Sequence, residues 1–349
     1  MDYKILYIED STPDTFIREF TSQDFSVKHI DPTTLEEVLD SIGGDINALV
    51  LDFRLTNGNG NARFDAPTVA QTIRTRKSNM HKDIPIILLS EESLITDYYE
   101  DYTSQDLFDF SVPKQVFRNE AEVYSNRIKS FVNAYTRVVE VDYNYNEILG
   151  LTKEDYSQLD YRIDIELNNK HLKKDTFAII RFINHELIQT TGVLVNEAIL
   201  SARLGVKQSS KDWQNLKEKL NSCAYNGILS DIFPTWWMEK IQNWWKSNSD
   251  LKLRRSTAEE RVNEIKRITG LVELDVHELS PHTKSKKFWT ACVDTNDAID
   301  FIDGLELVKK NLYAWQESDY ISINSALEQT KSIEFVNPLE LKELRLQTQ

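Results

Sequence analysis

The sequence Lys4-Ile5-Leu6-Tyr7-Ile8-Glu9-Asp10 decides the fold of the first part of this chain. Its apolar residues form a nearly continuous run, where a half-exposed strand would alternate apolar with polar residues. Continuous runs are typical of parallel strands that are covered on both faces. The stretch therefore predicts a buried parallel strand that ends in a pair of carboxylates.

Similar runs recur along the next hundred residues and are separated by amphipathic stretches. The expected strands after the first are 25–30, 48–51, 84–89 and 108–112. The expected helices are 14–20, 35–42, 67–76 and a long one from 116 to about 139. Strands alternating with helices indicate an α/β fold with a doubly wound parallel sheet of five strands, covered by helices on both faces.

Composition and charge limit the classes of function. The chain has 349 residues, which suggests two or three domains, and a formal charge of −15. Residues 1–140 hold 14 basic and 24 acidic side chains, so 14 − 24 gives −10 for this part alone. Such acidity repels phosphates and disfavours nucleic acid as a partner. No apolar run is long enough for a membrane span, and Cys223 and Cys292 are too few for a disulfide framework, so we expect a cytoplasmic protein.

Side chains that can bind ions or take part in catalysis follow the ends of the predicted strands. The first strand is followed by Glu9 and Asp10, the third by Asp52 and the fourth by Ser90, and the last runs into Lys114. In open parallel sheets, ligands bind outside the carboxyl ends of the strands. Carboxylates that converge there require a cation, and hard oxygen ligands favour Mg²⁺ over zinc. The hydroxyl and the ammonium complete a site of the size of a phosphate group.

These five residues, in this order, resemble the site of receiver domains of two-component response regulators, over residues 1 to about 135. The resemblance implies a flavodoxin-like fold, with Asp52 as the residue that accepts a phosphoryl group from a phosphohistidine. It also implies Mg²⁺ bound by Asp10, Asp52 and the backbone carbonyl of Arg54, with Glu9 acting directly or through water. Lys114 and Ser90 are expected to contact two of the phosphoryl oxygens.

The sequence departs from the receiver pattern at several positions. Thr56 and the Asn-rich stretch 57–61 replace the usual shorter loop after the acceptor, and Pro113 precedes Lys114 where the family usually has proline after the lysine. Ser111 stands at the usual place of the aromatic switch residue, with Phe110 one position earlier. We therefore expect any aromatic switch to involve Phe110.

Residues 141–349 resemble no family that we can name, and we place the boundary between the two domains at residues 140–150. The pattern predicts a mainly helical domain with a small β element. Expected helices cover 175–204, with a break at Gly192, then 234–246 and 338–346, and short strands cover 288–293 and 320–323. The helix over 234–246 would place Trp236, Trp237, Trp244 and Trp245 on one side, as part of the core or as a docking surface.

The sequence leaves two classes of function open for the second domain. Residues 201–209 resemble the turn of a helix-turn-helix, but the apolar positions that a second helix needs are Lys211 and Gln214. We therefore favour protein–protein interaction, or a phosphate sink for a shared kinase, over a DNA-binding transcriptional regulator. The expected partners are a histidine kinase or phosphotransfer protein, and a second receiver, an effector protein or a homodimer is left open. No P-loop, dinucleotide fingerprint or kinase signature indicates an enzymatic output.

Overall fold

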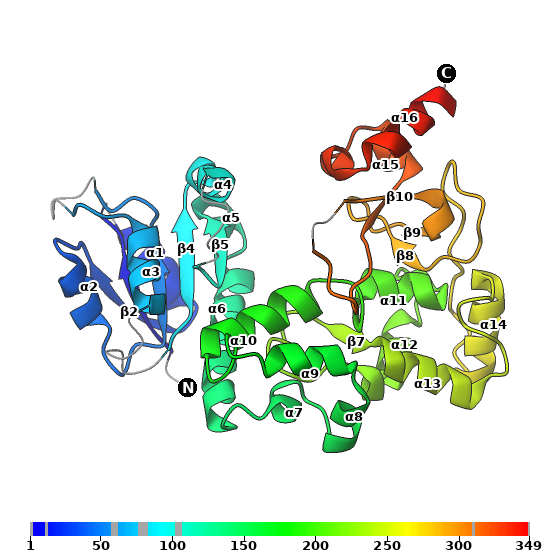
Figure 1. Cartoon of the computed structure of the whole chain (residues 1–349), viewed down its shortest axis with the longest axis horizontal. Helices are drawn as coiled ribbons and strands as arrows, with labels where there is room; N and C mark the ends of the chain where they lie inside the picture. Colours follow the sequence, from blue (N-terminus) through cyan, green and yellow to red (C-terminus); the bar gives the residue numbers. More distant parts are fainter. Residues whose placement is uncertain are drawn as a thin grey trace. The chain divides into compact units, whose positions relative to one another are not determined.

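The computed structural model describes residues 3–10, 13–56, 62–75, 83–101, 107–308 and 311–347 (Figure 1). Two compact units make up the chain: residues 1–148 with 167–181 form the first, and residues 149–166 with 182–349 form the second. The predicted division at about residue 140 stays a prediction. The Asn-rich stretch 57–61 lies outside the described residues.

A five-stranded parallel sheet is the centre of the first unit. Its strands are β1 (Tyr3–Ile8), β2 (Phe25–Ile30), β3 (Ala48–Leu51), β4 (Ile86–Ser90) and β5 (Phe110–Pro113). They lie in the order β2-β1-β3-β4-β5, and every neighbouring pair is parallel. This is the strand order of flavodoxin-like folds, so the predicted fold is confirmed.

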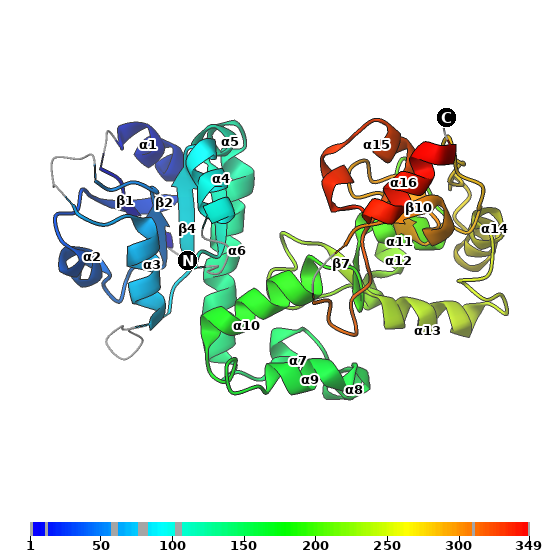
Figure 2. The ribbon, with the colours of Figure 1, turned by 45° about the horizontal axis from the view of Figure 1, so that its top comes forward.

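Helices cover both faces of this sheet (Figures 1 and 2). The first unit contains α1 (Asp14–Ser22), α2 (Leu35–Ser41), α3 (Ala66–Thr75), α4 (Glu92–Asp101), α5 (Lys114–Asn119) and α6 (Ala121–Glu140). Alternate strand residues such as Leu6, Leu49 and Leu88 share one buried cluster with Val38 of α2 and Val69 of α3. On the opposite face, α1, α5 and α6 contribute an aromatic layer, because residues of a strand alternate between faces.

The long helix expected from residue 116 to 139 is wrong in one respect, because it is broken at Glu120. There the backbone leaves the helical region, with φ −130° and ψ 38°, and separates α5 from α6. Neither glycine nor proline marks this break. The two helices serve different parts of the core: Phe117 of α5 packs on Phe20, whereas Phe131 of α6 packs on Phe110.

The remainder of the first unit comes from later in the chain. It contains α7 (Tyr145–Ile148) and most of α10 (Thr176–Phe182). The Phe177 ring of α10 lies 3.7 Å from the guanidinium carbon of Arg74 in α3, and the Tyr145 hydroxyl donates to the Leu167 carbonyl at 2.6 Å. These contacts attach residues 167–181 to the unit that holds the parallel sheet.

The second unit is mainly helical with small antiparallel sheets, as predicted. Its helices are α8 (Lys153–Gln158), α9 (Tyr161–Leu167, to residue 166), a π-helical turn (Ile183–Ile188), α11 (Glu197–Leu204), α12 (Trp213–Lys219), α13 (Met238–Asn248), α14 (Ala258–Thr269), α15 (Ile323–Leu327) and α16 (Pro338–Gln347). Short 3-10 turns cover Asn221–Cys223, Phe301–Asp303 and Lys331–Phe335. The strand pairs are β6 (Leu194–Asn196) with β7 (Thr235–Trp237), β8 (Thr290–Ala291) with β9 (Ala298–Ile299), and β10 (Gly304–Glu306) with β11 (Tyr320–Ser322).

The expected helix over residues 234–246 is wrong at its start. Thr235, Trp236 and Trp237 form strand β7, which pairs with β6, and the helix α13 begins only at Met238. β-Branched and aromatic residues suit a buried strand, and pairing with β6 overrides the helical spacing of the tryptophans. Trp236 and Trp245 are buried in the core of this unit, with Trp244 packed against it.

The segment that resembles a helix-turn-helix has no second helix at the required place. Helix α11 ends at Gly205, which takes a left-handed conformation with φ +77°, and α12 begins only at Trp213. The intervening residues are too many for the short turn of that motif. Among the helices of the described residues, none is long and apolar enough to cross a membrane.

Candidate functional site

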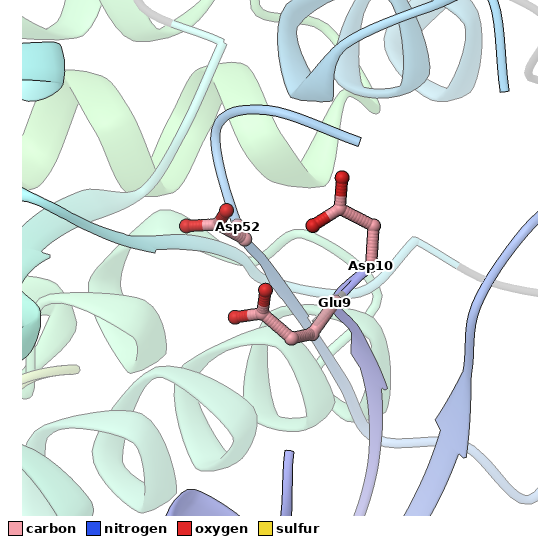
Figure 3. Close-up of side chains that lie close together, drawn as sticks. All are labelled: Glu9, Asp10 and Asp52. Atoms are coloured by element: carbon pink, nitrogen blue, oxygen red, sulfur yellow. The ribbon is translucent and has the colours of Figure 1, made fainter. Parts of the chain in front are cut away.

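Five predicted site residues come together at one edge of the parallel sheet. Glu9 and Asp10 follow β1, Asp52 follows β3, Ser90 is the last residue of β4, and Lys114 begins α5 directly after β5. The strands are parallel, so their carboxyl ends meet at the same edge. Figure 3 shows the three carboxylate side chains gathered there.

The three acidic residues are close enough to share one cation. Glu9, Asp10 and Asp52 each offer a carboxylate oxygen, and these oxygens all lie within 4.8 Å of one another. Glu9 is only 2% exposed and Asp52 only 7% exposed. Buried carboxylates at this separation repel one another strongly, because little water screens their charges.

Lys114 supplies positive charge to two of the three carboxylates. Its ammonium nitrogen lies 2.7 Å from Oε2 of Glu9 and 3.0 Å from Oδ1 of Asp52. Burial alone would lower the pKa of Lys114, but Asp52 and Glu9 outweigh burial and raise this pKa. The lysine is therefore charged at neutral pH and offsets part of the negative charge of Glu9 and Asp52.

The Ser90 hydroxyl lies beside the proposed acceptor. It accepts a hydrogen bond at 3.3 Å from the backbone N–H of Phe53, the residue that follows Asp52. Strand β4 places it there, because Ser90 pairs with Pro113 at the last position of the β4–β5 ladder. A hydroxyl and an ammonium therefore flank Asp52.

Opposing electrostatic effects act on the Asp52 carboxylate. Burial raises its pKa and Glu9 adds to this effect, while Lys114 and the nearby Ser90 hydroxyl oppose it. Oδ1 of Asp52 is buried and accepts no hydrogen bond within the described residues, although Lys114 forms an ion pair with it. Oxygen ligands with excess negative charge suit a hard cation, so the donor set fits Mg²⁺.

Arg54, the fourth residue expected at the metal, lies two positions after Asp52 in the loop that follows β3. Its side chain is exposed, which agrees with a contribution through the backbone alone. The role of its carbonyl as a ligand stays a prediction, as do the individual roles of the other site residues.

Sequence reasoning missed one residue of this site. Tyr7 of β1 is completely buried, and its hydroxyl donates a hydrogen bond to Oε2 of Glu9 at 2.9 Å. Burial and the neighbouring Glu9 raise the pKa of Tyr7 far above its usual range, so the hydroxyl stays protonated. The signal was the spacing of two residues within one strand, which places Tyr7 and Glu9 on the same face.

The fold and site define a flavodoxin-like domain with a lysine-paired cluster of carboxylates at the carboxyl edge of its sheet. Most of the solved structures that match part of the chain are receiver domains of response regulators. One is a receiver domain from Methylobacillus flagellatus, with 16% identity over 37% of this chain and 99% of that chain and a TM-score of 0.28.

Two further matches cover a similar part of the chain. The receiver domain of a sensor histidine kinase from Pseudomonas aeruginosa, with a magnesium ion coordinated in its active-site cleft, shows 20% identity over 38% of this chain and 99% of that chain, with a TM-score of 0.30. A structure described as adenylate cyclase from Rhodopirellula baltica shows 17% identity over 41% of this chain and 99% of that chain, with a TM-score of 0.32.

At these identities the likeness concerns the fold of the N-terminal part alone. No protein-family model and no curated protein matches the chain. The chemistry of the site therefore has to be argued from the residues at the sheet edge.

Proposed function

We propose that the first unit is a receiver domain that accepts a phosphoryl group on Asp52 and acts as a response regulator in a cytoplasmic two-component phosphorelay. The donor is a phosphohistidine on a histidine kinase or on a phosphotransfer protein. One observation carries the proposal: a buried aspartate at the sheet edge is flanked by an ammonium at 3.0 Å, a serine hydroxyl and two further carboxylates.

In this proposal, Asp52, Lys114 and Ser90 each have a separate role in the reaction. An oxygen of the ionised Asp52 attacks phosphorus, the bond between phosphorus and the imidazole nitrogen of the donor breaks, and an acyl phosphate forms. Lys114 pairs with one phosphoryl oxygen, and the Ser90 hydroxyl donates to another. Lys114 already contacts Asp52, and the Ser90 hydroxyl is hydrogen-bonded to the next residue along the chain, so both groups lie near a phosphoryl group attached to Asp52.

Asp10, Asp52 and the carbonyl of Arg54 would hold Mg²⁺, with Glu9 acting directly or through water. When bound, the ion would neutralise negative charge on the phosphoryl oxygens and on the carboxylates. Support comes from the three carboxylates, whose oxygens lie within 4.8 Å of one another, and from Lys114, which pairs with Glu9 and Asp52.

The second unit, in this proposal, acts through protein–protein interaction, or the whole chain serves as a phosphate sink. DNA binding has less support, because the helix after Gly205 starts too late for a helix-turn-helix. A gel shift with the DNA upstream of the protein's own gene, with and without phosphorylation, separates the classes. A phosphorylation-dependent, sequence-specific shift would favour the transcriptional regulator.

Phosphorylation of the full chain tests the site directly. Incubation with acetyl phosphate or a phosphorylated histidine kinase, followed by separation on a phosphate-affinity gel, should yield a phosphorylated wild type that depends on Mg²⁺. Asp52→Ala should abolish the phosphorylated band.

Asp45→Ala provides the matched control, because Asp45 is an exposed aspartate of the same unit whose ion pair with Lys4 lies away from the site. We expect it to be phosphorylated like the wild type. Phosphorylation that persists in Asp52→Ala would refute Asp52 as the acceptor, and a wild type that accepts no phosphoryl group would refute the function.

A further inference from the structure

Tyr7 has an unusual position for a residue of a buried strand. Its ring belongs to the aromatic layer between β1 and α1, with centroids 6.3 Å from Phe16 and 5.9 Å from Phe20. Its hydroxyl, however, leaves this apolar layer and reaches the carboxylate of Glu9 at the sheet edge. One residue therefore connects the core with the candidate site.

Geometry fixes this connection tightly. Tyr7 and Glu9 are two residues apart on an extended strand and face the same side. The ring is enclosed by α1 and by His29 of β2, at a centroid distance of 6.0 Å. Because Tyr7 is completely buried, its hydroxyl has little freedom to turn to another partner.

The tyrosine and the lysine share a single oxygen. Oε2 of Glu9 accepts from the Tyr7 hydroxyl at 2.9 Å and from the Lys114 ammonium at 2.7 Å. Glu9 is nearly completely buried, so a loss of hydrogen bonds to its carboxylate would be costly. The Tyr7 hydroxyl therefore gives Oε2 a hydrogen-bond donor that is separate from Lys114.

We propose that Tyr7 is a positioning residue of the metal and phosphoryl site, which fixes the orientation of the Glu9 carboxylate and keeps it hydrogen-bonded when Lys114 moves. This inference rests on the proposed function. It assigns to Tyr7 a role that a phenylalanine of the same shape cannot fill. Hydrogen-bond partners of metal ligands act in this way, by fixing the ligand and its charge distribution.

Tyr7→Phe in the full chain tests the proposal, since it removes the hydroxyl and keeps the ring. Mg²⁺ binding is measured by titration calorimetry in the absence of any phosphodonor. We expect the Mg²⁺ dissociation constant to rise roughly tenfold, the lower end of the cost of losing such a partner. The Mg²⁺ concentration for half-maximal phosphorylation by acetyl phosphate should rise by the same factor.

Tyr3→Phe is the matched control. Tyr3 lies on the same strand and the same face, and its hydroxyl donates to Asn133 at 3.1 Å, away from the site. The same chemical change there should leave the Mg²⁺ dissociation constant unaltered.

A second comparison separates positioning from a general loss of structure. In a Glu9→Gln background, Tyr7→Phe should add no further loss of Mg²⁺ affinity, because the hydroxyl acts through the carboxylate. Tyr7→Phe with unchanged Mg²⁺ affinity, or with an equal loss in both backgrounds, would overturn the role of Tyr7 while leaving the proposed function intact. A wild type that binds no Mg²⁺ would overturn both.

Discussion

Two ends of the same parallel sheet each hold a buried carboxylate, a cation and a tyrosine hydroxyl. At the carboxyl end these are Glu9, Lys114 and Tyr7. At the amino end, Asp109 forms an ion pair with Arg74 at 2.8 Å and accepts from the Tyr135 hydroxyl at 2.9 Å. The two groups have the same chemical components, but their surroundings differ.

In the amino-end group, the charged side chains are also hydrogen-bonded to the neighbouring backbone. Besides its bond to Asp109, the Arg74 guanidinium donates to the carbonyls of Ile84 and Leu107, and Asp109 also accepts from the N–H of Ile86. Asp109 forms the ion pair with Arg74, and the charge of Asp83 also acts on this group. At the carboxyl end, oxygens of three carboxylates lie within 4.8 Å of one another, and Lys114 pairs with two of these carboxylates, Glu9 and Asp52. The close gathering of three carboxylate oxygens, rather than burial alone, therefore distinguishes the candidate site from the amino-end network.

The largest difference between the two ends is expected when the cation is removed. Arg74→Ala leaves Asp109 buried without its counter-charge and should lower the free energy of unfolding by about 3–5 kcal/mol. Lys114→Met should lower it less, and Mg²⁺ should restore part of that loss but none of the loss in Arg74→Ala. Urea denaturation with and without MgCl₂ measures both effects. If Mg²⁺ restored the same free energy of unfolding to both variants, the proposed difference between the two ends of the sheet would be wrong.

Removal of the hydroxyl at the amino end should affect stability alone. Tyr135→Phe deletes a hydrogen bond to a charged group and should cost about 1.5–3 kcal/mol of unfolding free energy. Mg²⁺ affinity should be the same as in the wild type, in contrast to Tyr7→Phe. Calorimetric titration with Mg²⁺ and urea denaturation of the same sample test this, and weakened Mg²⁺ binding in Tyr135→Phe would contradict it.

Mg²⁺ should stabilise the wild type through the carboxyl end. At a free concentration ten times its dissociation constant, the gain is about 1.4 kcal/mol. Without metal, Asp52→Asn should itself be more stable than the wild type by about 1 kcal/mol, because it removes one of three repelling charges. Asp52→Asn should also lose most of the gain from Mg²⁺. Thermal denaturation in EDTA and in MgCl₂ gives both values.

The smallest effect concerns pH. Burial raises the pKa of Asp52, so folding favours its protonated form, and the penalty of the ionised form appears as the pH rises through this raised pKa. In EDTA, the stability advantage of Asp52→Asn over the wild type should therefore be absent at low pH and grow toward neutral pH. An advantage that shrinks with rising pH would contradict the direction of the shift.

Much of the first unit could be predicted from the sequence because its signals are local. Continuous apolar runs mark the strands, and the parallel order brings Glu9, Asp52 and Lys114 to one edge without any knowledge of side-chain contacts. Tyr7 was missed because it lies within the run itself, where an aromatic residue indicates only a core position. Its hydroxyl becomes informative once the register places Glu9 beside it.

Tertiary packing decided the features that the sequence pattern did not predict. The break at Glu120 has no glycine or proline to mark it and depends on where Phe117 and Phe131 find partners. Trp236 and Trp237 have helical spacing with the tryptophans that follow, yet pairing with β6 makes them a strand. In both places the competing structure depends on residues far away in the sequence.

The first unit takes residues 167–181 from beyond a segment that belongs to the second unit. The chain therefore passes between the units three times, and Phe177 lies on Arg74 only because of the second passage. A gene fragment that ends near residue 148 would encode the whole parallel sheet but would lack residues 167–181. Exchange of the second unit by recombination would preserve the Arg74 contact only if the joint fell after residue 181, and residues 149–166 would then be inherited together with the first unit.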